Sequence, residues 1–348
     1  MMRMTVLASG SKGNSMVVSS SRTRILVDAG LSCRELFKRM RLAEEDPSTL
    51  DAILITHEHQ DHVQGLAVTA RKLGIPVYFT EATHRGWMRW MVPPKRMTYA
   101  DWLKGSAQGL GHRAQEGKTE VVADSCELAG ESLDASGFEG REEGLGTRDQ
   151  GFEATDEASA VCEIADLEEE QSGAALEVDP CRLPRVEYFR AGSGFCVGDI
   201  GVTAFTIPHD AADPVGFVFE AEGVRVGLAT DLGYVPPNVR QQLRNCDVLV
   251  IESNHDLEML RDGPYPWSVK QRVMSRVGHL SNEATANFLE GDYDGKATYV
   301  VLAHLSESNN LPELATVAAE RALRERMNLL ANRLVLARQH EAISSIFL

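Results

Sequence analysis

The sequence predicts an α+β fold in which a two-layered sheet is flanked by helices. Short runs of apolar and β-branched residues alternate with segments in which apolar residues recur at helical spacing. The same alternation occurs in both halves of the chain. The halves are separated by residues 103–182, which contain hardly any sustained apolar periodicity. Without this segment, the rest of the 348 residues has the size of one ordinary domain.

In the first half, each predicted strand is a short apolar run, and each predicted helix carries apolar residues three and four positions apart. Residues 52–56 read Ala-Ile-Leu-Ile-Thr and are typical of a buried strand, whereas Val63, Leu66 and Leu73 belong to one helical stripe. The predicted strands are 4–8, 16–19, 24–27, 52–56 and 76–79, and the predicted helices are 33–40, 61–73 and 81–90.

The second half follows the same rules. Residues 202–207 and 224–229 are apolar runs that end just before polar residues, and the C-terminal portion alternates helices with strands. The predicted strands are 202–207, 215–220, 224–229, 248–252, 298–302 and 334–337, and the predicted helices are 238–244, 268–276, 282–289 and 311–326.

Residues 103–182 are predicted to be an inserted, largely disordered segment, with residues 1–102 and 183–348 forming the domain. The segment contains 20 acidic and 6 basic residues, whereas the rest of the chain contains 31 acidic and 29 basic residues. Most of the net charge of −16 therefore belongs to the segment, so it does not exclude a polyanionic substrate of the nearly neutral domain. The segment is interpreted as a solvated loop or, alternatively, as an acidic flap that competes with nucleic acid or binds a protein partner.

The run His-Glu-His-Gln-Asp-His at residues 57–62 contains four candidate metal ligands, which are His57, His59, Asp61 and His62. Alternate side chains of an extended chain point to one side, so His57, His59 and Asp61 are expected to share a face. A helical turn that begins near Asp61 then brings His62 beside them. Imidazole and carboxylate are ligands that Zn²⁺ and Mn²⁺ accept, so the motif predicts half of a two-metal hydrolase site.

Further ligands are expected where other predicted strands end. His209, Asp231 and His304 each follow an apolar run, and residues just past strands often carry chemistry on a rigid scaffold. Taken singly, each has another interpretation: a capping Asp, a surface His, or a core His with a satisfied hydrogen bond. Their occurrence after three separate strands favours a common site.

Together with Asp28, which follows the strand at 24–27, these motifs resemble the five-motif series of the metallo-β-lactamase superfamily. The resemblance implies a four-layer αββα sandwich with the site at one edge of two packed sheets. It also implies that Asp28 orients the ligands and that Asp231 bridges two metals. The implied ligands are His57, His59 and His209 for one metal, and Asp61, His62 and His304 for the other.

Further segments resemble the YycJ/WalJ group of this superfamily. Those segments are residues 7–15 (Leu-Ala-Ser-Gly-Ser-Lys-Gly-Asn-Ser), 251–256, 265–267, 278–282 and 303–306. Members of that group are described as DNA exonucleases that act 5′ to 3′, with links to mismatch repair. The resemblance implies this activity, whereas composition and spacing alone indicate only a metallohydrolase.

The expected chemistry assigns roles to three residues. Two divalent cations, Zn²⁺ or Mn²⁺, lower the pKa of water and screen the charge of a phosphodiester. Asp61 is expected to accept the water's proton, and Glu252 with His279 resembles the pair that protonates the leaving oxygen in phosphodiesterases of the superfamily. Alternatively, His279 caps the helix that begins near Asn282.

Four residues are weaker candidates for contacts with the substrate. A Gly-containing turn can direct backbone N–H groups at a phosphate, but the same composition also makes an ordinary hairpin. The four candidates are Ser11, Asn14, Asn254 and His255.

A phosphodiesterase acting on DNA is the leading hypothesis. The same site could act on RNA, on a small phosphodiester or on a thioester, and a less favoured alternative is a regulatory partner that keeps its metals structurally. A cytoplasmic protein is expected, because the sequence lacks both an apolar run of about 20 residues and the features of a signal peptide. The six cysteines include no Cys-x-x-Cys pair, so neither a disulfide framework nor a cysteine zinc site is expected.

Overall fold

The computed structural model of the chain describes residues 1–92, 179–327 and 333–348. The predicted acidic segment at 103–182 lies outside the described residues, apart from 179–182. Among the described residues, no helix combines the length and the apolar character needed to cross a membrane.

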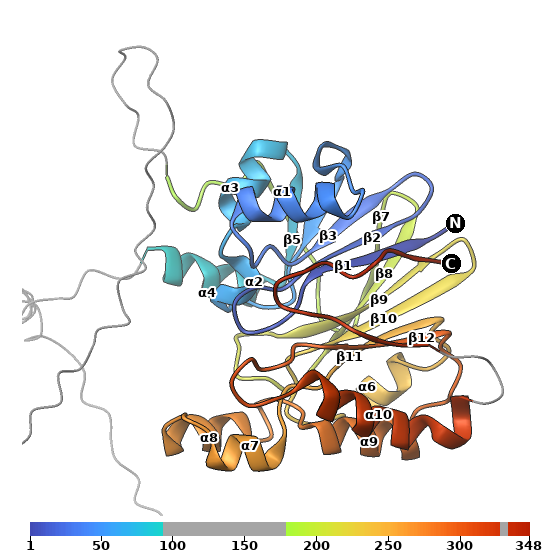
Figure 1. Cartoon of the computed structure of the whole chain (residues 1–348). Helices are drawn as coiled ribbons and strands as arrows, with labels where there is room; N and C mark the ends of the chain where they lie inside the picture. Colours follow the sequence, from blue (N-terminus) through green and yellow to red (C-terminus); the bar gives the residue numbers. More distant parts are fainter. Residues whose placement is uncertain (93–178, 328–332) are drawn as a thin grey trace, which may run out of the picture. The chain divides into compact units, whose positions relative to one another are not determined.

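Two sheets of seven strands each, counted over the described residues, form the centre of the fold (Figure 1). Their orders are β14-β1-β2-β3-β4-β5-β6 and β13-β12-β11-β10-β9-β8-β7. The first sheet contains β1 (Arg3–Ala8), β2 (Ser15–Ser19), β3 (Arg24–Val27), β4 (Ala52–Leu54), β5 (Pro76–Phe79), β6 (Arg185–Tyr188) and β14 (Ile346–Phe347). The second contains β7 (Gly194–Val197), β8 (Ile200–Thr206), β9 (Val215–Ala221), β10 (Val224–Ala229), β11 (Val248–Glu252), β12 (Tyr299–Ala303) and β13 (Arg333–Leu336).

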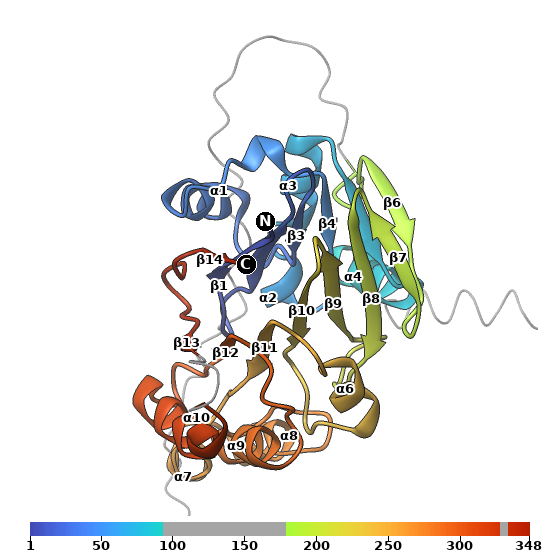
Figure 2. The same cartoon turned by 90° about the vertical axis from the view of Figure 1, so that its right-hand side faces the viewer.

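Helices cover the outer face of each sheet, and Figure 2 shows the same layers from the side. The first sheet carries α1 (Cys33–Leu42), α3 (Leu66–Leu73) and α4 (Glu81–Met91). The second carries α6 (Pro237–Gln242), α9 (Asn282–Gly291) and α10 (Pro312–Met327). The remaining helices are η1 (Pro47–Thr49), α2 (Gln60–Val63), α7 (Leu257–Asp262) and α8 (Trp267–Val273).

The alternation of side chains along each strand produces these layers. In β11, Val248 and Val250 pack into the core between the two sheets, whereas Leu249 and Ile251 face the helices. Both faces of the strand are therefore apolar, as expected for a sheet covered on both sides. The predicted four-layer αββα sandwich is confirmed.

The prediction of one continuous helix over residues 61–73 is wrong, because the structure divides this stretch into α2 and α3. Gly65 lies at the break, and its N–H donates to the carbonyl oxygen of Ala29 at 2.8 Å. A Cβ at this position would lie 2.0 Å from the carbonyl oxygen of Leu31, so only glycine allows the chain at residue 65 to approach the backbone of Leu31 this closely. The prediction also lacked β6, β7, β14, η1 and α7, which are short elements.

The pairing of the strands brings several strand ends to one edge of the molecule. β3 pairs in parallel with β4, and β10, β11 and β12 are parallel to one another, so their C-terminal ends lie together. This edge lies at the left of Figure 1, with α2, α4, α7 and α8, whereas the two chain termini lie at the other edge. The strand ends at this edge precede the polar residues singled out in the sequence.

Candidate metal centre and active site

Three of the predicted site residues adopt a left-handed backbone where strands end. Asp28 follows β3, Asp231 lies just past β10, and His304 follows β12, with φ of 58°, 60° and 58°. This conformation is uncommon for residues other than glycine and tends to occur at functional sites. The sharp turn at each strand end places the side chain at the edge of the sheets.

A first group of possible metal ligands contains only histidines. Suitable nitrogen atoms of His57, His59 and His209 lie within 4.8 Å of one another. Nδ1 of His59 lies 3.2 Å from Nε2 of His209, and Nε2 of His57 is buried without a hydrogen-bond partner. Three imidazole nitrogens that converge in this way fit the preference of Zn²⁺ and similar cations.

A second group combines two carboxylates with two imidazoles. Ligand atoms of Asp61, His62, Asp231 and His304 also lie within 4.8 Å of one another. Nε2 of His62 lies 3.5 Å from Oδ2 of Asp61 and 3.5 Å from Oδ2 of Asp231. Oδ2 of Asp231 and Nε2 of His304 are buried and have no hydrogen-bond partner. Buried polar atoms are costly unless satisfied, so these atoms indicate a place for a cation.

Hydrogen bonds behind the ligands fix which imidazole nitrogen faces the site. Nδ1 of His62 lies 2.8 Å from Oδ2 of Asp28, Nδ1 of His209 lies 3.2 Å from the carbonyl oxygen of Gly278, and Nδ1 of His304 lies 2.8 Å from Oε1 of Glu252. A carboxylate or a carbonyl oxygen can only accept, so each Nδ1 carries the proton and each Nε2 is left for a metal.

Asp28 is held rigidly in this supporting position. Its Oδ1 accepts a hydrogen bond from the backbone N–H of Thr56 at 2.9 Å, and its Oδ2 accepts one from the Thr56 hydroxyl at 2.9 Å. Burial raises the pKa of the Asp28 carboxyl, although the neighbouring His62 opposes this shift. These contacts support the orienting role of Asp28, which stays a prediction.

Glu252 holds two histidines at once. Its carboxylate is fully buried, and Oε1 lies 2.8 Å from Nδ1 of both His279 and His304. Oε2 accepts hydrogen bonds from the backbone N–H groups of Leu232 and Leu280, both at 3.0 Å. Burial would raise the pKa of Glu252, but His279 and His304 outweigh it and lower the pKa to about 2. Sequence reasoning paired Glu252 with His279 but missed its bond to His304.

The alternative role of His279 as a helix cap is wrong. The N-cap of α9 is Ser281, whose hydroxyl accepts a hydrogen bond from the backbone N–H of Ala284 at 3.1 Å. Burial would lower the pKa of His279, yet the adjacent Glu252 carboxylate raises it above its ordinary value. His279 is therefore an oriented imidazole beside the second group of ligands, and Glu252 favours its protonated form.

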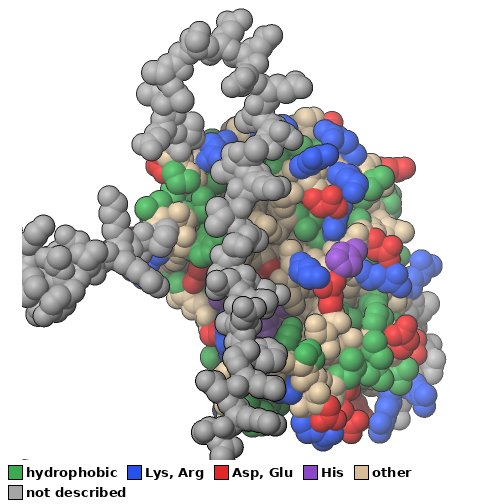
Figure 3. Space-filling view, turned by 60° about the vertical axis from the view of Figure 1, so that its left-hand side comes forward, with side chains coloured by type: hydrophobic (Ala, Val, Ile, Leu, Met, Phe, Trp, Pro, Cys, Tyr) green, Lys and Arg blue, Asp and Glu red, His purple; other side chains and the backbone are tan. Residues whose placement is uncertain are grey.

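A pocket of about 350 Å³ opens onto both groups of ligands. Figure 3 shows part of the face of the molecule on which this pocket opens, with histidine side chains next to hydrophobic ones. Its lining residues are Ser11, His59, Gln60, Asp61, Asp210, Asp231, Val269, Arg272, Val273, Gly278, His279 and His304. A substrate in this pocket would contact candidate ligands, His279 and Ser11.

The structure brings only one of the four weaker substrate-contact candidates to this pocket. Ser11 lines it, whereas Asn14, Asn254 and His255 are 7%, 5% and 1% exposed. Nδ2 of Asn14 donates to Oδ2 of Asp61 at 3.0 Å, and Nδ2 of Asn254 donates to the carbonyl oxygen of His304 at 2.8 Å. Both asparagines thus position candidate ligands, and the geometry does not support direct contact with substrate by these three residues.

The chain is similar to known proteins over most of its length. The family model described as the metallo-beta-lactamase superfamily matches residues 8–141, and the one described as a beta-lactamase superfamily domain matches residues 154–305. The chain is 30% identical over 322 residues to "Exodeoxyribonuclease YycJ" of Bacillus anthracis, which covers 92% of this chain and 89% of that relative. The chain belongs to the metallo-β-lactamase superfamily.

Two further similarities agree with this assignment. This metallo-β-lactamase-fold chain is 30% identical over 311 residues to "Exodeoxyribonuclease WalJ" of Streptococcus pneumoniae, covering 89% of this chain and 84% of the relative. The predicted membership of the YycJ/WalJ group is thereby confirmed. The solved structure of Zn(2+)-bound PqqB from Methylobacterium extorquens has a TM-score of 0.54 at 15% identity and covers 100% of both chains, which supports the fold.

Membership of the superfamily and the donor set together make the protein a metal-dependent hydrolase. The orphaned atoms Nε2 of His57, Oδ2 of Asp231 and Nε2 of His304 show that the residues present fit a bound cation. Whether Asp231 bridges two ions stays a prediction.

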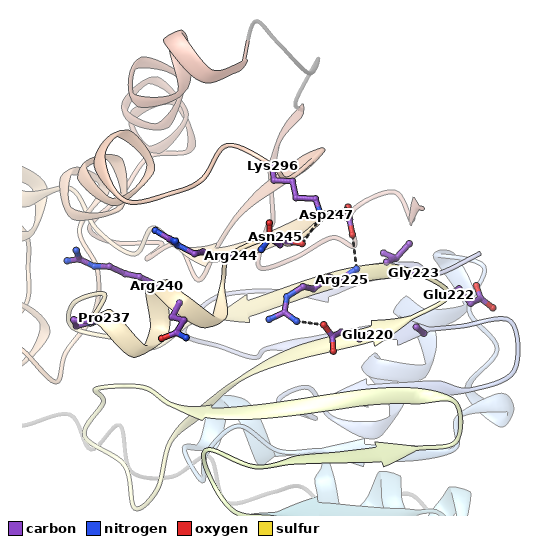
Figure 4. A pocket seen from close by; sticks show the side chains of 13 residues that line it. Glu220, Glu222, Gly223, Arg225, Pro237, Arg240, Arg244, Asn245, Asp247 and Lys296 are labelled. Atoms are coloured by element: carbon purple, nitrogen blue, oxygen red, sulfur yellow. Dashed lines mark hydrogen bonds and ion pairs between the residues drawn. The ribbon is translucent and has the colours of Figure 1, made fainter.

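A larger pocket, of about 1140 Å³, lies at the other end of β10 in this metallo-β-lactamase fold (Figure 4). Four of its charged groups form ion pairs within it: Arg225 with Glu220, and Lys296 with Asp247. No candidate metal cluster among the described residues lies in it. The smaller pocket is thus the candidate active site.

Proposed function

We propose that this protein is a two-metal phosphodiesterase that degrades DNA exonucleolytically from the 5′ end, and that it acts in DNA repair in the cytoplasm. The names of its two curated relatives support DNA as the substrate. The single structural observation that carries the proposal is the pair of buried Glu252 and partly exposed His279, which would add a proton donor to the pocket beside the metal ligands.

The two groups of ligands would hold two divalent cations, for which Zn²⁺ and Mn²⁺ both suit the donor set. When bound, the cations supply Lewis acidity that makes hydroxide available near neutral pH and offsets the charge of a phosphodiester. One cation would be held by His57, His59 and His209, the other by Asp61, His62, Asp231 and His304.

Asp61 and His279 would move the protons of the reaction. Burial would raise the pKa of Asp61, but the nearby His62 and His304 hold it well below its ordinary range, so the side chain stays a carboxylate. Asn14 fixes its Oδ2 through a hydrogen bond of 3.0 Å. His279 uses Nδ1 for its hydrogen bond with Glu252, which leaves Nε2 to donate a proton to the leaving oxygen of the substrate.

Other substrates of the same site make different demands on His279. RNA and small phosphodiesters share the leaving alkoxide, and only direct comparison separates them from DNA. A thiolate leaves without a proton more readily than an alkoxide, so a thioesterase would have little use for Glu252 and His279. A regulatory protein with structural metals would need neither residue.

The substrate is tested with the purified full-length protein, loaded with Mn²⁺ or Zn²⁺. Duplex DNA labelled at either the 5′ or the 3′ end is offered beside labelled RNA and a thioester, and a His59→Ala/Asp61→Ala double variant serves as the control. We expect the 5′ label to be released as mononucleotides by the wild type only. Release from the 3′ label first, or cleavage of RNA or thioester alone, would contradict the proposal.

The role of His279 is tested with two leaving groups. His279→Asn is expected to slow DNA cleavage by about 10²–10⁴-fold, the usual contribution of general acid catalysis. Bis(p-nitrophenyl) phosphate should be much less affected, because nitrophenolate leaves without being protonated. Equal losses on both substrates would show that His279 does not act as the proton donor.

A further inference from the structure

One side of the active-site pocket is an exposed segment made of α8 and the residues that follow it. Val269 and Arg272 of α8 line the pocket, as does Gly278 beyond the helix. In residues 267–278, only Lys270 and Gly278 are buried. Val269 and Val277 are 37% and 44% exposed, so apolar surface continues outward from the polar pocket.

The same segment carries an excess of positive charge. Residues 264–282 include Lys270, Arg272 and Arg276 but no Asp or Glu. Lys270 is buried and donates to the carbonyl oxygen of Arg261 at 2.7 Å, so the two arginines are the exposed cations of the segment. Arg272 pairs with Asp210, whereas Arg276 forms no salt bridge with any residue that the structure describes.

Arg276 lies instead on an exposed aromatic ring. Its guanidinium carbon is 4.4 Å from the centroid of the Tyr234 ring, and Tyr234 is 36% exposed. A planar guanidinium stacked on a ring offers both a flat surface for a nucleobase and a charge for a phosphate.

This stack is fixed relative to the catalytic residues. A Cβ on Gly233 would lie 2.3 Å from the backbone carbon of Arg276, so the loop after Asp231 touches the segment directly. The backbone N–H of His279 donates to the carbonyl oxygen of Val273 at 2.9 Å. Tyr234 follows Asp231 by three residues, and Arg276 precedes His279 by three, so the stack lies close to the pocket along both segments.

We propose that Tyr234, Val269, Arg272, Arg276 and Val277 form a basic lip on which the DNA strand that leads to the scissile phosphodiester lies, with its bases against the Tyr234–Arg276 stack. The inference rests on the function proposed above. DNA is the occupant that fits because Arg276 offers an exposed positive charge, the two valines offer exposed apolar surface, and Val269 and Arg272 line the pocket. Stacking of this kind tolerates any base, so the lip grips the strand without reading its sequence.

The lip is tested by steady-state kinetics of the Mn²⁺-loaded full-length protein on a single-stranded oligonucleotide and on bis(p-nitrophenyl) phosphate. Tyr234→Ala and Arg276→Ala should each raise KM for the oligonucleotide about tenfold, because one stacked base is lost. Cleavage of the small substrate should stay unchanged, because it does not reach the lip. Arg276→Ala should also lower the dependence of log KM on log salt by about 0.7, and Tyr234→Phe should behave as wild type.

Trp267→Ala is the matched control. Trp267 is 62% exposed on the same helix, but it precedes Val269 by two residues and so points about 200° away from it around the helix. Removal of its side chain should change the cleavage of neither substrate. The proposal is refuted if Tyr234→Ala and Arg276→Ala cleave the oligonucleotide as wild type does. It is also refuted if both variants lose activity equally on the oligonucleotide and on bis(p-nitrophenyl) phosphate.

Failure of the proposed function would be recognised separately, because the wild type would then not cleave DNA at all. In that case fluorescence anisotropy of a labelled oligonucleotide with the metal-loaded protein decides about the lip. Weaker binding by Arg276→Ala than by Trp267→Ala supports it. Equal binding by the two variants overturns it.

Discussion

Replacement of Asp28 by asparagine should weaken metal binding without unfolding the protein. The substitution keeps the shape of the side chain, and asparagine tolerates the left-handed φ of 58° at this position. If the amide oxygen continues to accept from the backbone N–H of Thr56, the amide NH₂ replaces Oδ2 and meets Nδ1–H of His62. Two donors then face each other, so the proton of His62 moves to Nε2, the nitrogen needed for the metal.

The size of the effect follows from the bond that is lost. A hydrogen bond to a charged group contributes about 1.5–3 kcal/mol, which corresponds to a loss of about 10- to 100-fold in affinity for the second metal. The loss is measured by titrating the protein against a chromogenic chelator. The metal-free protein should also lose some stability, because the same hydrogen bond forms without metal, but it should stay folded.

The control is Asp199→Asn. Asp199 also accepts hydrogen bonds from two hydroxyls, those of Ser20 and Thr23, at 2.7 and 2.6 Å, but it holds no candidate ligand. It should cost stability and leave metal affinity unchanged. Wild-type metal affinity in Asp28→Asn, or an equal loss in Asp199→Asn, would refute the reasoning.

Three further outcomes are expected. Glu252→Gln, assayed at saturating metal, should move the alkaline limb of the pH–kcat profile to lower pH; Glu252 raises the pKa of His279, so without it the proton donor is lost earlier as pH rises, and an unmoved limb would exclude this coupling. Removal of metal by a chelator should lower the melting temperature by about 5–10 °C relative to protein at 100 times the Kd, as differential scanning calorimetry can check. Gly30→Ala would place a Cβ 1.7 Å from the carbonyl oxygen of Asp61 and should cost about 3 kcal/mol in chemical denaturation, whereas Gly291→Ala, which meets open space, should stay within about 1 kcal/mol of wild type.

Much of the candidate site could be predicted from the sequence because its chemistry depends on residue types that follow apolar strands. The run at 57–62 and the isolated His209, Asp231 and His304 were identified by their positions after strands, and the structure brings all of them together. The residues that brace the ligands were harder to recognise. Asn14 resembled a phosphate-contacting turn, because nothing local reveals that its amide reaches Asp61 from 47 positions away.

The missing parts of the fold have similar causes. β6 (Arg185–Tyr188) is an edge strand whose side chains are exposed or half-buried, so it lacks the apolar run by which buried strands were recognised. The break at Gly65 results from contact with Leu31, a distant part of the chain. Periodicity describes one segment at a time, and neither feature belongs to a single segment.

The left-handed turns at Asp28, Asp231 and His304 imply that the sheets hold the backbone of the site in an unfavourable conformation. Such backbone conformations cost about 1–3 kcal/mol each and persist only because their surroundings enforce them. Relaxation of β10 or β12 would therefore release these turns before the domain melts. Mutations that loosen these strands should first reduce the amount of bound metal. Metal retention during heating would therefore report how firmly the sheets hold these turns rather than the chemistry of the ligands.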